Sequence, residues 1–230
     1  MRTVGILGGM GPEATVLLMQ KIIAAVPARD DGDHVPLIVD QNPQVPSRIA
    51  RLIEGTGADP APVLVAMAKR LEGAGAMALA MPCNTAHHYA DEIRAAVSVP
   101  FLDMVAASAR AALAVAGLGG KVGLLASPAV AKVGLFDRAL GALGLEVIHP
   151  DDGAAMLAAI RSIKAEGPND AARGALLAAS GALLAKGAEV QLIACTEFSL
   201  IPEAVAPGVQ AIDTLDVLVG EIVGFARASA

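Results

Sequence analysis

Short aliphatic runs alternate with longer Ala- and Leu-rich stretches along the chain. Short runs rich in Val, Ile and Leu are typical of strands buried in a parallel sheet, and the longer stretches are typical of helices. Strands are predicted at Val4–Leu7, Leu37–Val39, Ala76–Met81, Phe101–Leu102, Lys121–Leu125, Glu146–His149, Val190–Ala194 and Ala211–Ile212. Helices are predicted at Glu13–Val26, Pro62–Gly73, Thr85–Val97, Met104–Ala116, Val133–Leu143, Asp152–Ile163, Asn169–Lys186 and Thr214–Ala228. The alternation indicates an α/β protein built from βαβ units.

The two halves of the chain repeat one another. Thr3–Leu7 matches Lys121–Leu125, and Val99–Asp103 reads like Val209–Asp213. Four residues recur 112 positions later, as Leu71, Gly75, Ala76 and Cys83 in the first half and Leu183, Gly187, Ala188 and Cys195 in the second. We expect two pseudo-symmetric, Rossmann-like α/β domains, each with a four-stranded, mainly parallel sheet. The expected bounds are 1–103 with a C-terminal helix at about 212–230 for the first domain, and 104–211 for the second.

Each half places one cysteine, Cys83 or Cys195, at the carboxyl end of its third strand. Ligands bind at that edge of open α/β sheets. A cysteine is also a common small core residue, and for either one alone the two interpretations are equally good. Their equivalent positions in the repeat favour a site that uses both.

The composition limits the classes of function. The chain has 230 residues, 55% of them hydrophobic, and a net charge of −6, with four Phe, one Tyr and no Trp. It is long enough to fold around a substantial core. It offers neither positive charge nor stacking surface for nucleic acid, so we expect no nucleic-acid partner.

The sequence also argues against a membrane protein. The longest uncharged stretch, Gly73–Ala90, contains a proline, an asparagine and two histidines, which suit a membrane span poorly. The first apolar run ends at Gly8 and is too short for a signal peptide. We therefore expect a cytoplasmic protein with two free thiols.

Polar residues follow each cysteine: Asn84 and Thr85 after Cys83, and Thr196 and Glu197 after Cys195. A thiol at the start of a helix lies near the positive end of the helix dipole, which lowers its pKa toward neutral pH. The free N–H groups there, with these side chains, are able to hold a carboxylate. Ordinary helix capping explains each polar residue equally well.

His87 lies one helical turn after Cys83, within hydrogen-bonding range of the thiolate or of groups that support it. A surface histidine explains its position nearly as well. The two cysteines and four histidines show no CxxC or HxxxH spacing, so a metal site is not expected.

Two loops offer further ligand contacts. The first, Gly8–Ala14, contains a loose GxGxxA pattern, but Pro12 lacks the N–H that a pyrophosphate cradle needs, so we expect a floor for a small ligand. In the second, two prolines stiffen the turn before Arg48, which suits bidentate carboxylate binding. Lys164 occupies the matching region of the second half. Each cation taken alone is more simply a solvated surface residue.

Four motifs together resemble the cofactor-independent aspartate racemases of the aspartate/glutamate racemase superfamily. They are Ile6-Leu7-Gly8-Gly9-Met10-Gly11-Pro12, Asn42-Pro43-Gln44, Met81-Pro82-Cys83-Asn84-Thr85-Ala86-His87 and Cys195-Thr196-Glu197. The similarity covers essentially the whole chain. The two cysteine motifs are specific in combination, whereas the glycine-rich start alone is a weak signal.

The resemblance implies an amino-acid racemase that needs neither pyridoxal phosphate nor metal, with the substrate in a cleft between two domains and a homodimer as the usual assembly. It implies Cys83 and Cys195 as the two acid/base groups, with His87 and Glu197 in support. Arg48 and Lys164 fall where the family holds the side-chain carboxylate. The α-carboxylate positions are Asn84, Thr85 and Thr196, and Met10 and Gln44 also fall among the substrate contacts.

Two departures from the family pattern bear on the substrate. The family often has an Asp before the Arg, where this chain has Ser47, and a Gly-Thr-rich turn where this chain has Ser127-Pro128-Ala129. Aspartate is the expected substrate, with glutamate or broader specificity as the alternative. A maleate-isomerase-like or decarboxylase-like enzyme of the superfamily and a non-catalytic binding protein also remain open. Two retained thiols argue against pure binding.

Overall fold

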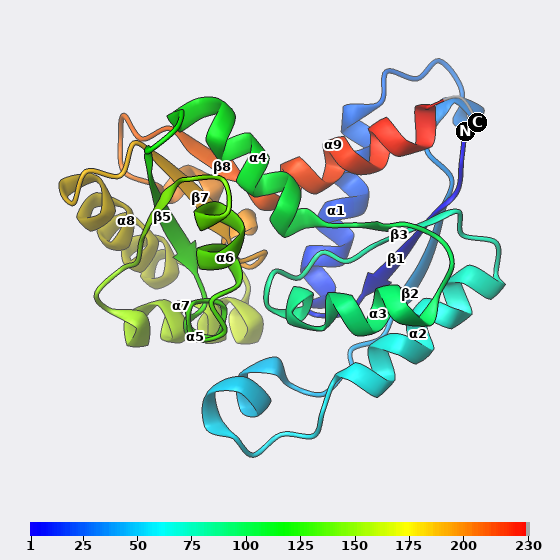
Figure 1. The fold of residues 1–230 in the computed structure, drawn as a ribbon, viewed down its shortest axis with the longest axis horizontal. Helices are drawn as coiled ribbons and strands as arrows, with labels where there is room; N and C mark the ends of the chain where they lie inside the picture. Colours follow the sequence, from blue (N-terminus) through cyan, green and yellow to red (C-terminus); the bar gives the residue numbers. More distant parts are fainter. Residues whose placement is uncertain (229–230) are drawn as a thin grey trace. The chain divides into compact units, whose positions relative to one another are not determined.

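The computed structural model describes residues 1–228 and divides them into two compact units. Unit 1 consists of Met1–Met104 together with the segment that begins at Leu215, and unit 2 consists of Val105–Thr214 (Figure 1). The chain therefore leaves unit 1, completes unit 2 and returns to unit 1 for its final helix. No helix among the described residues has the length and apolar character needed to cross a membrane.

Unit 1 is built on a parallel sheet with the strand order β2-β1-β3-β4. Its strands are β1 (Val4–Gly8), β2 (Leu37–Gln41), β3 (Ala78–Ala80) and β4 (Phe101–Leu102). Its helices are α1 (Pro12–Ala25), α2 (Ala61–Gly73), α3 (Ala90–Ala96) and α9 (Thr214–Arg227), with shorter helical segments η1 (Asp31–Asp33), η2 (Ala50–Glu54) and η3 (Thr85–Tyr89).

Unit 2 repeats this arrangement, with the strand order β6-β5-β7-β8 and every pair parallel. Its strands are β5 (Lys121–Ala126), β6 (Glu146–Ile148), β7 (Val190–Ala194) and β8 (Ala211–Asp213). Its helices are α4 (Met104–Ala116), α5 (Pro128–Lys132), α6 (Leu135–Gly141), α7 (Gly153–Glu166) and α8 (Asp170–Ala185), with the short segments η4 (Phe198–Leu200) and η5 (Pro202–Ala204). The predicted pair of four-stranded parallel sheets is confirmed.

Helices cover both faces of each sheet, so each unit has three layers and two apolar cores. In unit 1, α2 and α3 pack on one face, while α1 and α9 pack on the other. In unit 2, α4 and α6 cover one face, while α7 and α8 cover the other. Strands covered on both faces have no polar side, which is why the sequence shows continuous aliphatic runs rather than alternation.

The internal repeat marks a close contact between a strand and a helix. A Cβ atom placed on Gly5 of β1 would lie 2.8 Å from Ala76 Cβ and 3.1 Å from Leu71 Cβ. On Gly123 of β5 it would lie 3.1 Å from both Ala188 Cβ and Leu183 Cδ1. The repeated glycines thus let equivalent helices approach equivalent strands.

Two predicted helices are wrong in detail. The stretch predicted as Thr85–Val97 begins as a 3-10 turn, η3, in which His87 N–H donates to Asn84 O, and becomes α-helical only at Ala90. The stretch predicted as Val133–Leu143 is helical only over α6, which begins after Gly134 in the left-handed region at φ 61°. The short helix α5 just before it was not predicted. The π-helical segment η2 was not predicted at all.

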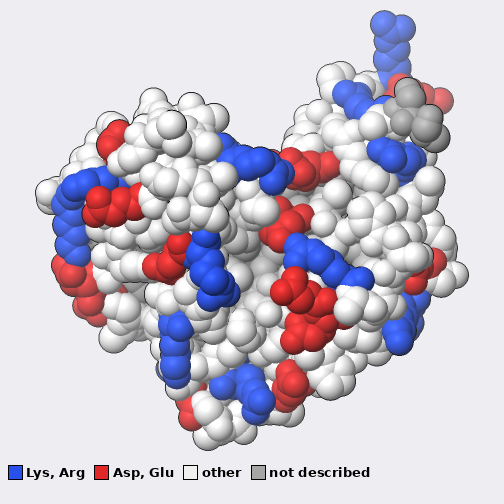
Figure 2. All heavy atoms as spheres, in the orientation of Figure 1, with Lys and Arg blue, Asp and Glu red and all other residues white. Residues whose placement is uncertain are grey.

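Acidic and basic side chains are interspersed over the face in Figure 2, and uncharged residues dominate it. Neither sign of charge forms a broad patch there.

Candidate active site

Cys83 lies just beyond the carboxyl end of β3, where the chain turns into η3. Its N–H donates to Met81 O at 2.8 Å, and the residue is only 6% exposed. Asn84 directly after it is buried, whereas Thr85 is partly exposed. The thiol and the polar residues that follow it therefore lie at the ligand-binding edge of the unit 1 sheet.

His87 supports the backbone of this turn. Its Nδ1 lies 2.9 Å from Cys83 O, and its Nε2 accepts the Met104 N–H at 3.2 Å. Because Nε2 accepts, Nδ1 carries the proton and donates to the carbonyl. Both ring nitrogens are thus used by the backbone, and the hydrogen bond from His87 reaches the carbonyl of Cys83 rather than its thiol.

Arg48 joins two loops at the same edge of the unit 1 sheet. Its guanidinium donates to Pro46 O at 3.1 Å, to Val45 O at 3.4 Å and, across to the glycine-rich loop, to Met10 O at 3.5 Å. Its Nε is buried without a hydrogen-bond partner in the described part of the chain. The structure thus brings Arg48 and Met10 together.

The residues beside Arg48 shape its turn. Gln44 is exposed, and its N–H donates to Asn42 Oδ1 at 3.0 Å. Ser47, which stands where the family often has Asp, accepts the Ala50 N–H through its hydroxyl at 3.2 Å. Ser47 therefore acts as a local cap at the start of η2.

Cys195 follows β7 in unit 2 and begins a tight turn. Its carbonyl accepts the N–H groups of Phe198 at 2.9 Å and Ser199 at 3.3 Å. Phe198 is fully buried in the core against α7 and α8, which anchors the turn. Cys195 itself is 7% exposed, and Thr196 beside it is buried.

The Cys195 thiol takes part in a line of three side chains. Its Sγ donates to Glu197 Oε2 at 3.0 Å, and Lys164 Nζ lies 3.0 Å from the other carboxylate oxygen, Oε1. Lys164 comes from the last turn of α7, and its side chain is 40% exposed against 9% for Glu197. The structure therefore brings Cys195, Glu197 and Lys164 together.

This arrangement overturns the expectation of a lowered pKa at Cys195. Burial raises the pKa of the Cys195 thiol well above its usual value, and the charge and hydrogen bond of Glu197 raise it further, while Lys164 acts in the opposite direction. The segment after Cys195 is one short 3-10 turn, η4, so little helix dipole opposes the cost of burying a thiolate.

Sequence reasoning missed the groups that tie the second cysteine turn to β8. Ser199 Oγ donates to Asp213 Oδ1 at 2.7 Å, and Thr214 Oγ1 donates to Ile193 O at 2.9 Å. Ser199 stands four residues after Cys195, as His87 stands four after Cys83. The 112-residue offset of the repeat was the signal that would have found Ser199.

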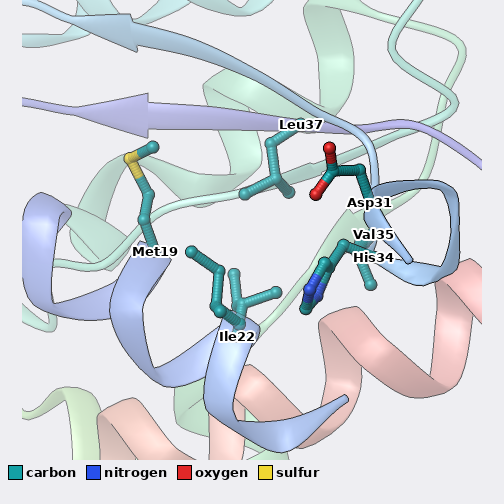
Figure 3. A pocket seen from close by; sticks show the side chains of 7 residues that line it. Met19, Ile22, Asp31, His34, Val35 and Leu37 are labelled. Carbon is teal, nitrogen blue, oxygen red and sulfur yellow. The ribbon is translucent and has the colours of Figure 1, made fainter. Parts of the chain in front are cut away.

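Two pockets differ in where they lie relative to the cysteine turns. In unit 2, Ser127 and Pro128 line a cavity of about 250 Å³ at the carboxyl ends of β5 and β6, together with His149 and Asp151. In unit 1, a larger cavity of about 390 Å³ lies between α1 and the start of β2 (Figure 3). Aliphatic side chains and Met19 form most of its wall, and Asp31 and His34 lie at one end. Because Leu37 begins β2, this larger cavity is at the opposite edge of the sheet from Cys83.

Among residues 1–228, no three His, Cys, Asp or Glu side chains come together as a set of metal ligands. Each unit has one cysteine at the carboxyl edge of its sheet, and a buried polar residue directly follows each cysteine. A thiol in such a position is able to act as an acid or base in proton transfer.

Known proteins share both the sequence pattern and this fold. The chain superposes on the Picrophilus torridus aspartate racemase with a TM-score of 0.85 and 27% identity, covering 98% of this chain and 94% of that one. An aspartate racemase homologue from Pyrococcus horikoshii OT3 has the same fold, with a TM-score of 0.76 and 24% identity over 99% of this chain and 100% of that one.

A curated relative is the broad specificity amino-acid racemase RacX of Bacillus subtilis (strain 168), which is 31% identical over 152 residues. That match spans 64% of this chain and 64% of RacX. The model of the Asp/Glu/hydantoin racemase family matches residues 7–222, which include both cysteine turns. The chain therefore belongs to the Asp/Glu/hydantoin racemase family.

Proposed function

We propose that this protein racemises an amino acid with two thiols and without pyridoxal phosphate, one removing the α-proton and the other supplying a new proton to the opposite face of the carbon. The observation that carries the proposal is the presence of one cysteine at the carboxyl end of the third strand of each unit, at equivalent points of the repeat. Family membership and the likeness to an aspartate racemase support the same reaction.

In the proposed reaction, one cysteine acts as thiolate and removes the α-hydrogen as a proton. The other acts as thiol and donates its proton to the opposite face of the same carbon. Their roles reverse with the enantiomer. The carbanion develops negative charge on the α-carboxylate, and Asn84, Thr85 and Thr196 supply hydrogen-bond donors beside the two thiols. Such donors stabilise the charge most strongly where water is excluded.

The substrate we propose is aspartate, with Arg48 and Lys164 on its second carboxylate. Within residues 1–228, the partners of Arg48 are neutral backbone carbonyls, so its charge is not balanced by a paired carboxylate. A guanidinium held in this way favours a bidentate carboxylate ligand. Lys164 contributes a second positive charge, which in the free protein is shared with Glu197.

The reaction is tested with the Cys83→Ser and Cys195→Ser variants. A hydroxyl is far less acidic than a thiol, so each substitution removes an acid/base group with little change in volume. Both variants should lose racemisation of L- and D-aspartate in either direction while keeping the wild-type circular dichroism spectrum. In deuterated water the wild-type product should carry one solvent deuterium at Cα. A single variant with near-native activity in both directions would disprove the two-thiol mechanism.

The substrate is tested by comparing kcat/KM for aspartate, glutamate and alanine. Aspartate should be fastest, and Arg48→Met should lower its kcat/KM about ten- to a hundredfold because a charge-assisted contact contributes roughly 1.5–3 kcal/mol. Arg70→Met, which removes a surface ion pair with Asp40, is the matched control. Similar rates for all three substrates would instead support the broad specificity of RacX. Absence of deuterium exchange with any amino acid would redirect the search to isomerase or decarboxylase substrates.

A further inference from the structure

The two cysteine turns differ in one charged group. The 112-residue offset that relates Cys83 to Cys195 relates Thr85 to Glu197. The turn in unit 1 therefore has a neutral hydroxyl where the turn in unit 2 has a carboxylate. Glu197 is buried. Its Oε2 accepts a hydrogen bond from the Cys195 thiol at 3.0 Å, and its Oε1 forms an ion pair with Lys164 Nζ, also at 3.0 Å.

This geometry distinguishes the thiol from the thiolate at Cys195. Only the protonated thiol is able to donate to Glu197 Oε2, and a thiolate 3.0 Å from that oxygen would be repelled by it. Burial strengthens the repulsion because little water screens it. The charged groups that act on Cys195 are Glu197, from its own turn, and Lys164, from α7 packed against that turn.

Lys164 has two effects in this line of side chains. Its ammonium group pairs with the buried carboxylate and holds it in place, because an unpaired buried charge is costly. Its positive charge also partly offsets the repulsion between Glu197 and a thiolate at Cys195. Removing Glu197 and removing Lys164 should therefore move the ionisation of Cys195 in opposite directions.

We propose that Glu197, held by Lys164, is a positioning residue that keeps Cys195 protonated in the resting enzyme, so that Cys195 begins the reaction as the proton donor. This inference rests on the proposed two-thiol function. In the first turnover the Cys195 S–H bond breaks and its proton forms a C–H bond at Cα, while Cys83 takes the departing α-proton. Cys195 then carries the negative charge, and the reverse reaction or exchange with solvent restores its proton.

The protonation of Cys195 is measured directly in a Cys83→Ser background, where Cys195 is the one remaining cysteine of the chain. The rate of alkylation by iodoacetamide, followed by mass spectrometry from about pH 6 to about pH 10, reports the thiolate fraction. Glu197→Gln should move the profile to lower pH by about one unit or more, giving roughly tenfold faster alkylation near pH 8. Lys164→Met should move the profile to higher pH and slow alkylation.

Matched controls remove surface ion pairs of unit 2. Glu203→Gln breaks the pair with Arg173, and Lys186→Met breaks the pair with Asp151, and both should leave the profile in place. If the Glu197→Gln variant unfolds, the upward shift in Lys164→Met still tests the proposal, because Lys164 is partly exposed. An unchanged profile in both variants, or a shift in the same direction in both, would overturn it. The experiment uses no substrate, so its failure is distinguishable from an absence of racemisation.

Discussion

The His87 ring links the cysteine turn of unit 1 to the start of α4, just after β4. Its two nitrogens bridge Cys83 O and the Met104 N–H, and the second contact requires an unprotonated Nε2. Burial lowers the pKa of His87, and the charge of Asp103 only partly opposes this effect. Protonation would both bury a charge and break the contact with Met104.

The stability of the fold should therefore depend on pH through His87. Its pKa is lower in the folded state than in the unfolded state, so the stabilisation is complete above about pH 6.5 and is lost as the pH falls below that value. One such group changes the free energy of unfolding by at most about 1.4 kcal/mol per pH unit. Urea denaturation at a series of pH values measures this slope in the wild type and in His87→Gln.

The exposed neighbour His88 supplies the control, because His88→Gln should keep the wild-type slope. Equal slopes between about pH 5 and pH 6.5 in the wild type and His87→Gln would show that another group causes the acid sensitivity.

At this scale the sequence pointed to candidate residues but not to their protonation. Residue type and position within the repeat were enough to single out Cys83 and Cys195, whereas Lys164 became a candidate through the family resemblance. The raised pKa of Cys195 was not predictable, because it depends on burial and on a carboxylate whose orientation is set by tertiary packing. The contact between Lys164 and Glu197 likewise joins residues 33 positions apart, 197 − 164 = 33, on α7 and the turn after β7.

Among the secondary-structure elements, the equivalent strands β1 and β5 test how tightly the repeat is packed. An alanine at Gly5 would place its Cβ 2.8 Å from Ala76 Cβ, whereas at Gly123 the nearest atoms are 3.1 Å away. Gly5→Ala should lower the free energy of unfolding by about 1–3 kcal/mol because the strand or the segment packed on it must move. Gly123→Ala should lower it by less.

Thermal denaturation with fitted unfolding enthalpies measures both effects. Gly141→Ala, in α6 where an added Cβ meets no neighbour, is the control and should stabilise slightly or have no effect. If Gly123→Ala lowered the free energy of unfolding more than Gly5→Ala did, the Cβ distances would not predict how well each contact accommodates an added methyl group.

Elements with a strong local pattern were predictable, and elements made by their surroundings were not. All eight predicted strands are present. The inner strands β1, β3, β5 and β7 follow from aliphatic runs because they are almost entirely buried, whereas the outer strands are partly exposed. The 3-10 turn η3 depends on the side-chain contacts of His87, and the break before α6 depends on the left-handed conformation of Gly134. A helical pattern of apolar residues continues across both positions, so periodicity alone does not show either break.

At the scale of the whole molecule, unit 1 depends on the last helix of the chain. Leu215, Leu218 and Ile222 of α9 are fully buried against β1 and α1. Leu218→Ala should lower the free energy of unfolding by about 2–5 kcal/mol, because apolar contacts are lost and a cavity is left behind. The loss should be confined largely to unit 1, because α9 contributes to its core and unit 2 has its own.

Native-state hydrogen exchange resolves the two units. Leu218→Ala should speed exchange in β1 and β3 and leave β5 and β7 protected, whereas Leu176→Ala, at a fully buried position of α8, should do the reverse. Equal acceleration in both sheets would mean that the two units unfold as one cooperative body.

The discontinuity of unit 1 has a consequence for the order in which the protein takes shape during synthesis. Every residue of unit 2 has left the ribosome before Leu215 emerges, so unit 1 receives α9, which together with α1 covers one face of its sheet, only after unit 2 has been made. Until then, the apolar face formed by Val4, Ile6 and Leu18 is partly open to solvent. Unit 2 should therefore be the first of the two units to be completed, and unit 1 before α9 arrives is the stage most exposed to chaperones and to aggregation.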